Sequence, residues 1–206
     1  MLDSKGFDLW AGEYDKAVGV SEAQNTYPFA GYKKILGEIF ADIMDKPKSV
    51  VLDLGFGTAT LTGRLYDNGH TIYGQDFSQA MIETAAKKMP NAKLFKGDFA
   101  EGLVAPLKSC SYDFIVATYS FHHVPYEKKA EILSLLFERL NDGGEILIGD
   151  IAFSSREELE KVAKSVGSEW DGDEYYSVVE ELRPYFPKIA FEKVSFCAGV
   201  ITIAKN

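Results

Sequence analysis

The stretch Val51–Thr62 (VLDLGFGTATLT) decides the fold of this chain. It begins inside an apolar run, Ser49–Leu54, which is typical of a strand buried on both faces. Gly55 and Gly57 follow this strand directly, and a helix is predicted over Thr58–Tyr66. Glycines at such a strand-to-helix turn permit a tight bend and let a ligand approach the backbone closely. The alternative is a glycine-rich turn that binds nothing.

Strand-like and helix-like segments alternate on both sides of this turn. The spacing predicts βαβ units and an α/β fold with a doubly wound, mostly parallel sheet. Two further strands, Phe191–Phe196 and Val200–Ala204, are separated by three residues, which predicts an antiparallel C-terminal hairpin. The other predicted elements are strands at Thr71–Asp76, Ala92–Lys96, Asp113–Thr118 and Glu145–Ile151, helices at 79–88 (capped by Ser78) and Glu127–Leu140, and a turn at Asn141–Gly144.

The length and composition favour one soluble, cytoplasmic domain. The 206 residues divide into a helical N-terminal cap or lid (1–47), a core (48–153) and C-terminal helices with the closing hairpin (154–206). A net charge of −9 argues against a nucleic-acid partner, which needs a basic face. Two cysteines are too few for a disulfide framework. We find neither a signal-peptide pattern nor an apolar stretch long enough to span a membrane.

An acidic residue ends the second predicted strand. Asp76 lies 19 residues after Gly57, and a carboxylate at about this distance from a glycine turn accepts hydrogen bonds from ribose hydroxyls. The other role for such a residue is to cap the next helix, but Ser78 is already placed to do that. The glycine turn and Asp76 together predict a nucleoside-containing cofactor.

Five blocks of the sequence resemble the motifs of class I S-adenosylmethionine-dependent methyltransferases, in particular small bacterial members. Their order and spacing match over about 100 residues. The opening segment Phe7–Asp15 is also similar, and Ala59 departs from the glycine often found there in the family. The resemblance implies a Rossmann-like, seven-stranded sheet. The five blocks are Val51–Thr62, Gly74–Lys88, Gly97–Leu103, Tyr112–Pro125 and Leu140–Asp150.

The resemblance also implies roles toward S-adenosylmethionine. Gly55 and Gly57 would contact its methionine part through the backbone, and Asp76 would accept from the ribose hydroxyls. Asp53 would lie near the ammonium group or order the loop. The cofactor carries a sulfonium, an ammonium, one carboxylate and no phosphate, so aspartates around it are electrostatically reasonable.

Three further residues are implied at the adenine. Phe77 would lie against the adenine face, with a core position as the alternative. Asp98 would accept from the exocyclic amine, with a loop cap as the alternative, and the backbone amide of Phe99 would reach a ring nitrogen.

The end of the fourth strand is expected to line the ligand crevice, because ligands bind outside the carboxyl ends of the strands. Thr118 stands there, and His122 and His123 follow it. Either histidine could be a general base, or could simply pack at the strand end. An adjacent histidine pair offers too few ligands for a metal, so none is predicted. The third histidine, His70, is expected at the surface.

The methyl acceptor is not identified by any cluster of residues. We predict a small molecule, in part because the strand end Thr118–Phe121 lacks the Asn-Pro-Pro-Tyr signature of many enzymes that methylate amino groups of bases or glutamine. Tyr14, the third candidate catalytic residue besides the two histidines, is predicted near the methionine end of the cofactor, and Tyr27 near the acceptor. Two alternatives remain: a cofactor-binding regulator or pseudoenzyme, and a nicotinamide-dependent oxidoreductase, although Thr60 replaces the third glycine of that fingerprint. The oligomeric state stays open.

Overall fold

The structure is a computed structural model and describes residues 25–205. The predicted site residue Tyr14, the segment Phe7–Asp15 and most of the proposed lid lie outside the described residues. The strands are β1 (Val50–Leu54), β2 (Thr71–Asp76), β3 (Lys93–Lys96), β4 (Tyr112–Thr118), β5 (Leu140–Phe153), β6 (Ser177–Val178), β7 (Ala190–Lys193) and β8 (Ala198–Ala204). The α-helices are α3 (Tyr32–Met44), α4 (Thr62–Asp67), α5 (Gln79–Lys88), α6 (Ala105–Lys108), α7 (Tyr126–Glu138), α8 (Arg156–Val166) and α9 (Val179–Leu182).

The strands form one sheet in the order β3-β2-β1-β4-β5-β8-β7, with β6 pairing with β5 outside this path. The pairs from β3 to β5 are parallel, and β8 is antiparallel to both β5 and β7. This confirms the predicted doubly wound sheet and its closing hairpin. The chain moves outward from β1 to β3 and then returns to β4 beside β1. The strand order therefore reverses between β1 and β4, which is where α/β sheets bind ligands.

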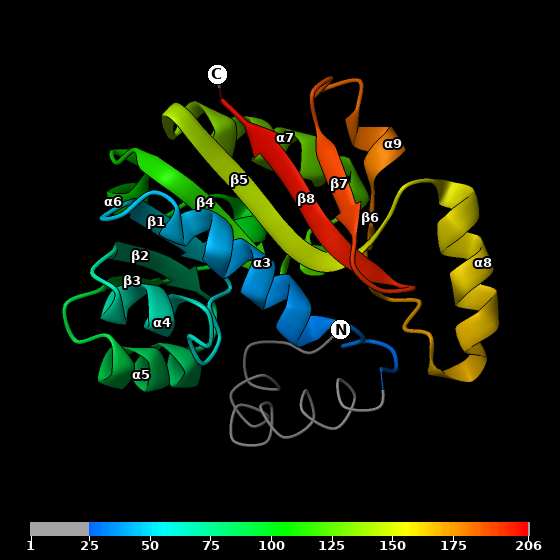
Figure 1. Ribbon diagram of the computed structural model, residues 1–206, viewed down its shortest axis with the longest axis horizontal. Helices are drawn as coiled ribbons and strands as arrows, with labels where there is room; N and C mark the ends of the chain where they lie inside the picture. The colour runs from blue at the N-terminus through cyan, green and yellow to red at the C-terminus, as the bar shows by residue number, and fades with distance from the viewer. Residues whose placement is uncertain (1–24, 206) are drawn as a thin grey trace.

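Each face of the sheet carries its own hydrophobic core. Val51 and Leu52 on β1 are both fully buried, but they belong to different clusters because neighbouring side chains point to opposite faces. Ile39 of α3 packs in the first cluster and Leu133 of α7 in the second. In Figure 1, α3 crosses the front of the sheet and α7 lies behind it. β1 is thus held rigidly from both sides.

Several predicted boundaries were wrong. The helix expected from Thr58 begins at Thr62 as α4, because the preceding loop is still turning at Ala59, where φ is +59°. The turn expected at Asn141–Gly144 is the first part of β5. Gly143 and Gly144 there exchange backbone hydrogen bonds with Lys205, which extends the sheet through the glycines.

Smaller differences affect the C-terminal hairpin and one histidine. The strand expected over Phe191–Phe196 runs from Ala190 to Lys193 as β7. His70 is buried rather than exposed, and burial lowers its pKa.

Among the described residues, no helix combines the length and the apolar composition that a membrane crossing requires.

Candidate active site

A cavity of about 510 Å³ lies at the carboxyl ends of β1, β2, β4 and β5, within the size range of small-molecule sites. Its wall includes most of the residues predicted from the sequence. They are Asp53, Gly55, Gly57, Asp76, Phe77 and Phe99 toward β1, β2 and the loop after β3, and Thr118, His122 and His123 after β4. Tyr27, predicted near the acceptor, also lines it. The fold thus brings residues from four separate sequence blocks together.

Asp76 organises the glycine turn. Its Oδ2 accepts a hydrogen bond from the Gly57 amide at 2.9 Å, and its Oδ1 accepts from the Ser78 amide at 2.9 Å. Ser78 caps α5 as predicted, since its hydroxyl accepts from the Met81 amide at 3.2 Å. The sequence argument missed the bond to Gly57, because separation along the chain does not show it. The role of Asp76 at the ribose stays a prediction.

The two glycines of the turn are required for different reasons. Both have positive φ, +71° at Gly55 and +53° at Gly57. A Cβ atom added at Gly55 would lie 2.5 Å from Cβ of Ser120, whose hydroxyl donates to the Leu54 carbonyl at 2.7 Å. A Cβ atom added at Gly57 would meet nothing within 4 Å. Gly55 therefore serves packing between β1 and β4, whereas Gly57 exposes backbone to the cavity.

Asp53 is a buried carboxyl group with one unpartnered oxygen. Its side chain lines the cavity although the residue is only 1% exposed, and Oδ1 has no hydrogen-bond partner among the described residues. Burial raises the pKa of Asp53 to about 7; the Thr62 hydroxyl opposes this rise and the neighbouring Asp76 adds to it. An unpartnered buried acceptor is costly unless a ligand satisfies it. The ammonium group of S-adenosylmethionine has the chemistry to do so.

Asp98 is the predicted cofactor residue that the structure does not place on the cavity wall. Its Oδ1 accepts from the Ala100 amide at 2.8 Å and caps η1 (Phe99–Glu101). This contact is the one expected if Asp98 caps the loop, which was the alternative to a contact with adenine. Phe99, the next residue, is 7% exposed and does line the cavity, as does Phe77. Their contacts with adenine stay predictions.

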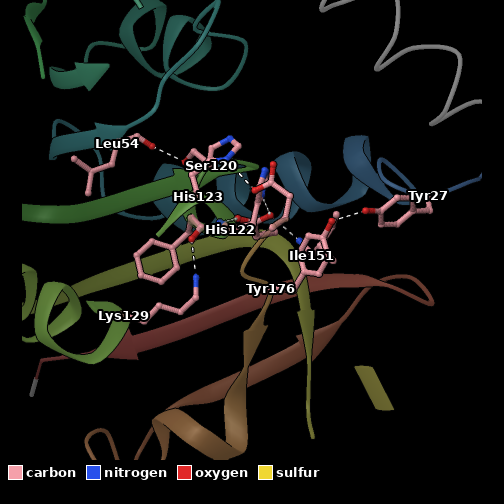
Figure 2. Close-up of polar contacts among 11 residues, drawn as sticks. Tyr27, Leu54, Ser120, His122, His123, Lys129, Ile151 and Tyr176 are labelled. Atoms are coloured by element: carbon pink, nitrogen blue, oxygen red, sulfur yellow. Dashed lines mark hydrogen bonds and ion pairs between the residues drawn. The ribbon is translucent and has the colours of Figure 1, made fainter. Parts of the chain in front are cut away.

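His122 is held by a buried carboxylate. It lies in η2 (Phe121–His123), a short 3-10 turn after β4. Its Nδ1 is 2.7 Å from Oδ1 of Asp150, and its backbone amide donates to Oδ2 at 3.0 Å. Burial opposes charge on His122, but the Asp150 carboxylate outweighs it and raises the pKa of the imidazole. Figure 2 shows His122 between His123 and Tyr176.

His123 has a partner that the sequence argument did not find. Its Nδ1 lies 3.0 Å from Oε2 of Glu174, which also lines the cavity. Glu174 stands in the acidic stretch 156–183, where a charge run usually marks a solvated helix face. The Tyr175 amide donates to the His122 carbonyl at 2.9 Å and fastens this segment to η2. Glu174 thus adds a third potential metal ligand to the histidine pair, which removes the reason for predicting no metal.

Two tyrosines line the cavity beside these groups. The hydroxyls of Tyr27 and Tyr176 are hydrogen-bonded, as Figure 2 shows. The Tyr27 hydroxyl also accepts from the Asp171 amide at 3.0 Å, and its ring stacks on Trp170 with 5.3 Å between centroids. Tyr27 comes from the segment before α3 and the others precede β6, so their meeting could not be read from the sequence.

A buried lysine on α7 is hydrogen-bonded to the backbone of η2. Lys129 on α7 is 2% exposed, and its Nζ donates to the Phe121 carbonyl at 2.7 Å (Figure 2). The ammonium also lies 4.5 Å from the centre of the Phe121 ring. Burial lowers the pKa of Lys129 to about 7. This lysine fixes the backbone from which both histidines project.

Comparisons with known proteins agree with this site. The family described as a methyltransferase domain matches residues 51–144. A protein of Geobacillus thermodenitrificans named an uncharacterized methyltransferase is 34% identical over 198 residues, covering 92% of this chain and 88% of that protein. An uncharacterized methyltransferase of Bacillus licheniformis is 33% identical over 211 residues, covering 97% and 96%.

A solved structure shares the fold. Magnesium protoporphyrin IX methyltransferase from Synechocystis PCC 6803, with bound S-adenosylhomocysteine, aligns with a TM-score of 0.66 at 18% identity, covering 86% of this chain and 85% of that one. Because these relatives are named methyltransferases, the alternative of a nicotinamide-dependent oxidoreductase is set aside. Together with the glycine turn, Asp53 and Asp76, they show that the chain belongs to the class I S-adenosylmethionine-dependent methyltransferases, with S-adenosylmethionine as its cofactor.

Proposed function

We propose that this enzyme methylates a small molecule bound at the β4–β5 end of the cavity. The observation that carries the proposal is that one cavity joins two chemically different walls. The turns after β1 and β2 provide the cofactor wall. The second wall lies beyond β4 and β5 and consists of the histidines, Glu174 and Tyr176. Because β1 and β4 are neighbouring strands, the two walls adjoin within the one cavity.

Methyl transfer from a sulfonium is an in-line displacement with a good leaving group, which the bound cofactor supplies. The protein has to orient the acceptor and exclude water. The Tyr27–Tyr176 hydrogen bond and the stacking of Tyr27 on Trp170 hold aromatic rings in place beside the second wall. An acceptor that keeps its proton at neutral pH needs a group to remove it. His122 and His123 are the titratable groups of this wall that can do so.

Two observations favour a small acceptor over a macromolecule. The net charge of −9 disfavours nucleic acid, and the second wall belongs to a cavity of about 510 Å³, which is within the size range of small-molecule sites. The Synechocystis neighbour is named for a porphyrin acceptor, which shows that this fold serves small-molecule methylation in that protein.

The test uses the purified full chain with S-adenosylmethionine that carries a deuterated methyl group. Panels of thiols, amines, hydroxyl compounds and carboxylates are supplied in parallel with total RNA and a protein extract, and mass spectrometry locates the label. Asp76→Ala protein is the control for cofactor-dependent transfer. Label in a small molecule, absent with the variant, is expected. Label confined to RNA or protein would overturn the proposal. So would S-adenosylhomocysteine binding without transfer to any panel, which favours a cofactor-binding regulator.

A further inference from the structure

We propose that His122, His123 and Glu174 bind a divalent transition-metal ion of the zinc class on the acceptor wall of the cavity. Each of the three residues offers one ligand atom, and these atoms all lie within 4.8 Å of one another. Nδ1 of His123 and Oε2 of Glu174 are 3.0 Å apart, and the two imidazole rings are 4.2 Å apart between centroids. A small inward movement of these side chains would place all three around one ion.

The ligand set indicates which metal would bind. Two imidazoles and one carboxylate are a typical set for zinc in catalytic sites, where three protein ligands leave a position open. Nitrogen-rich sets of this kind favour Zn²⁺, Ni²⁺ or Co²⁺ over Mg²⁺ and Ca²⁺, which prefer oxygen ligands. The side chains of His122, His123 and Glu174 are 13%, 21% and 12% exposed, and all three line the cavity. An ion could therefore enter through the cavity, and its open position would face the acceptor.

A buried carboxylate behind His122 supports the same interpretation. Metal-binding histidines commonly donate their second ring N–H to a carboxylate, which fixes the tautomer and the orientation of the ring. Asp150 is 1% exposed and lies 2.7 Å from Nδ1 of His122, which leaves Nε2 as the ligand atom. Asp150 also accepts from the backbone amides of His122 and Ile151, so its own position is fixed.

The backbone also brings the third ligand into place before any ion binds. Glu174 follows His123 by 51 residues. The hydrogen bond from the Tyr175 amide to the His122 carbonyl joins the two segments, at one ligand itself and at the residue next to Glu174. Lys129 holds the same turn through the Phe121 carbonyl. Such preorganisation is expected of a binding site more than of a solvent-exposed ion pair.

The role of the ion rests on the proposed function. An ion on this wall would bind the heteroatom of the acceptor and favour its deprotonated form, with the proton released to solvent. This would replace proton removal by a free histidine. The acceptors that fit are compounds with a thiol, hydroxyl or carboxylate group that can coordinate the metal.

The test measures metal binding alone, without cofactor or turnover. Protein stripped with a chelator and then dialysed is titrated with Zn²⁺ by calorimetry and with Co²⁺ by visible absorption. One ion per chain is expected, with the bands of Co²⁺ bound to nitrogen and oxygen. Glu174→Gln and His123→Ala should each weaken Zn²⁺ binding at least tenfold, and Asp150→Asn should weaken it as well. Glu169→Gln, which lines the same cavity but lies outside the cluster, is the matched control and should bind normally.

Two outcomes would overturn the inference. One is the absence of stoichiometric Zn²⁺ binding by protein that binds S-adenosylhomocysteine normally. The other is equal Zn²⁺ affinity in the Glu174→Gln, Glu169→Gln and unmodified proteins. Either result would leave His122–Asp150 and His123–Glu174 as two hydrogen-bonded histidine–carboxylate pairs. The absence of methyl transfer to small molecules would not affect this test, so failure of the proposed function and failure of the metal site are distinguishable.

Discussion

Replacing Asp53 by Asn should stabilise the folded protein and weaken cofactor binding. The Asp53 carboxyl group is buried, and its pKa of about 7 lies above the ordinary value of 3.8. A group whose pKa is raised on folding binds more protons in the folded state between these two pH values. The free energy of unfolding therefore falls as pH rises from about 4 to about 7. Above pH 7 the carboxylate is ionised inside the protein, and its full cost is present.

The size of the effect follows from the two pKa values. The difference between 3.8 and about 7 corresponds to about 4 kcal/mol of lost stability at pH 8. Asparagine has no charge to bury, but it leaves polar atoms unpaired at about 1–3 kcal/mol. We therefore expect Asp53→Asn to be more stable than the unmodified protein by about 1–3 kcal/mol at pH 8. No such gain is expected at pH 4.5, where the carboxyl is protonated and resembles the amide.

Urea denaturation at pH 4.5 and pH 8 measures the first half of the prediction, and calorimetry with S-adenosylhomocysteine measures the second. This product keeps the ammonium but lacks the sulfonium, so it isolates the group that Asp53 would hold. In the unmodified protein, affinity should fall up to tenfold for each pH unit below 7, because binding then requires Asp53 to lose a proton. The variant should bind at least tenfold more weakly at pH 8 and lose this pH dependence. Equal stability and equal affinity at pH 8 would refute the reasoning.

Four other substitutions test neighbouring parts of the site. Gly57→Ala should lower the affinity for S-adenosylhomocysteine at least tenfold with a small loss of stability. Gly55→Ala should lower the melting temperature strongly, because the added Cβ atom clashes with Ser120. Equal melting temperatures for the two variants would contradict the packing role of Gly55. Asp76→Ala should weaken binding by about 1–3 kcal/mol, because hydrogen-bonding groups are left unpaired; unchanged affinity in calorimetry would argue against the ribose role. Lys129, with a pKa lowered from 10.5 to about 7, binds fewer protons when folded, so unfolding free energy should rise by up to about 1.4 kcal/mol per pH unit between these values. In urea denaturation, the Lys129→Met variant should show no such rise in the free energy of unfolding between pH 7.5 and pH 9.5. If the variant still shows the rise, a group other than Lys129 causes it.

The sheet could be predicted from the sequence because its signals are local. Continuous apolar runs, turn residues and the spacing of the strands suffice to assign the strands from β1 to β5 and the final hairpin. The errors fall where a distant contact decides the local structure. Gly143 and Gly144 look like a turn, yet pairing with Lys205 draws them into β5. Ala59 looks helical, yet the loop that surrounds the cavity holds it at positive φ.

The cofactor wall was predictable for the same reason, and the acceptor wall was not. Asp53, Gly57 and Asp76 are fixed by position relative to the ends of β1 and β2. Glu174 and Tyr176 reach the cavity from a segment without a regular pattern, because the short strand β6 pairs with the extended end of β5. Their place depends on that pairing, at Ala152 and Phe153, which no local pattern indicates.

Three buried ionisable groups lie around the cavity, where burying their charges lowers the stability of the fold. Asp53 is the last residue but one of β1, Asp150 lies near the end of β5, and Lys129 holds the turn after β4. Each is at least 98% buried, and isolated charges in such positions lower stability unless they are paired. Asp150 is paired with His122, and Lys129 has a carbonyl acceptor. Oδ1 of Asp53 lacks a partner among the described residues. If the groups served folding alone, Asp53 would be the easiest to replace by an apolar residue. Because Asp53 lines the cavity, we expect a bound ligand to supply this partner, which the Asp53→Asn binding experiment tests.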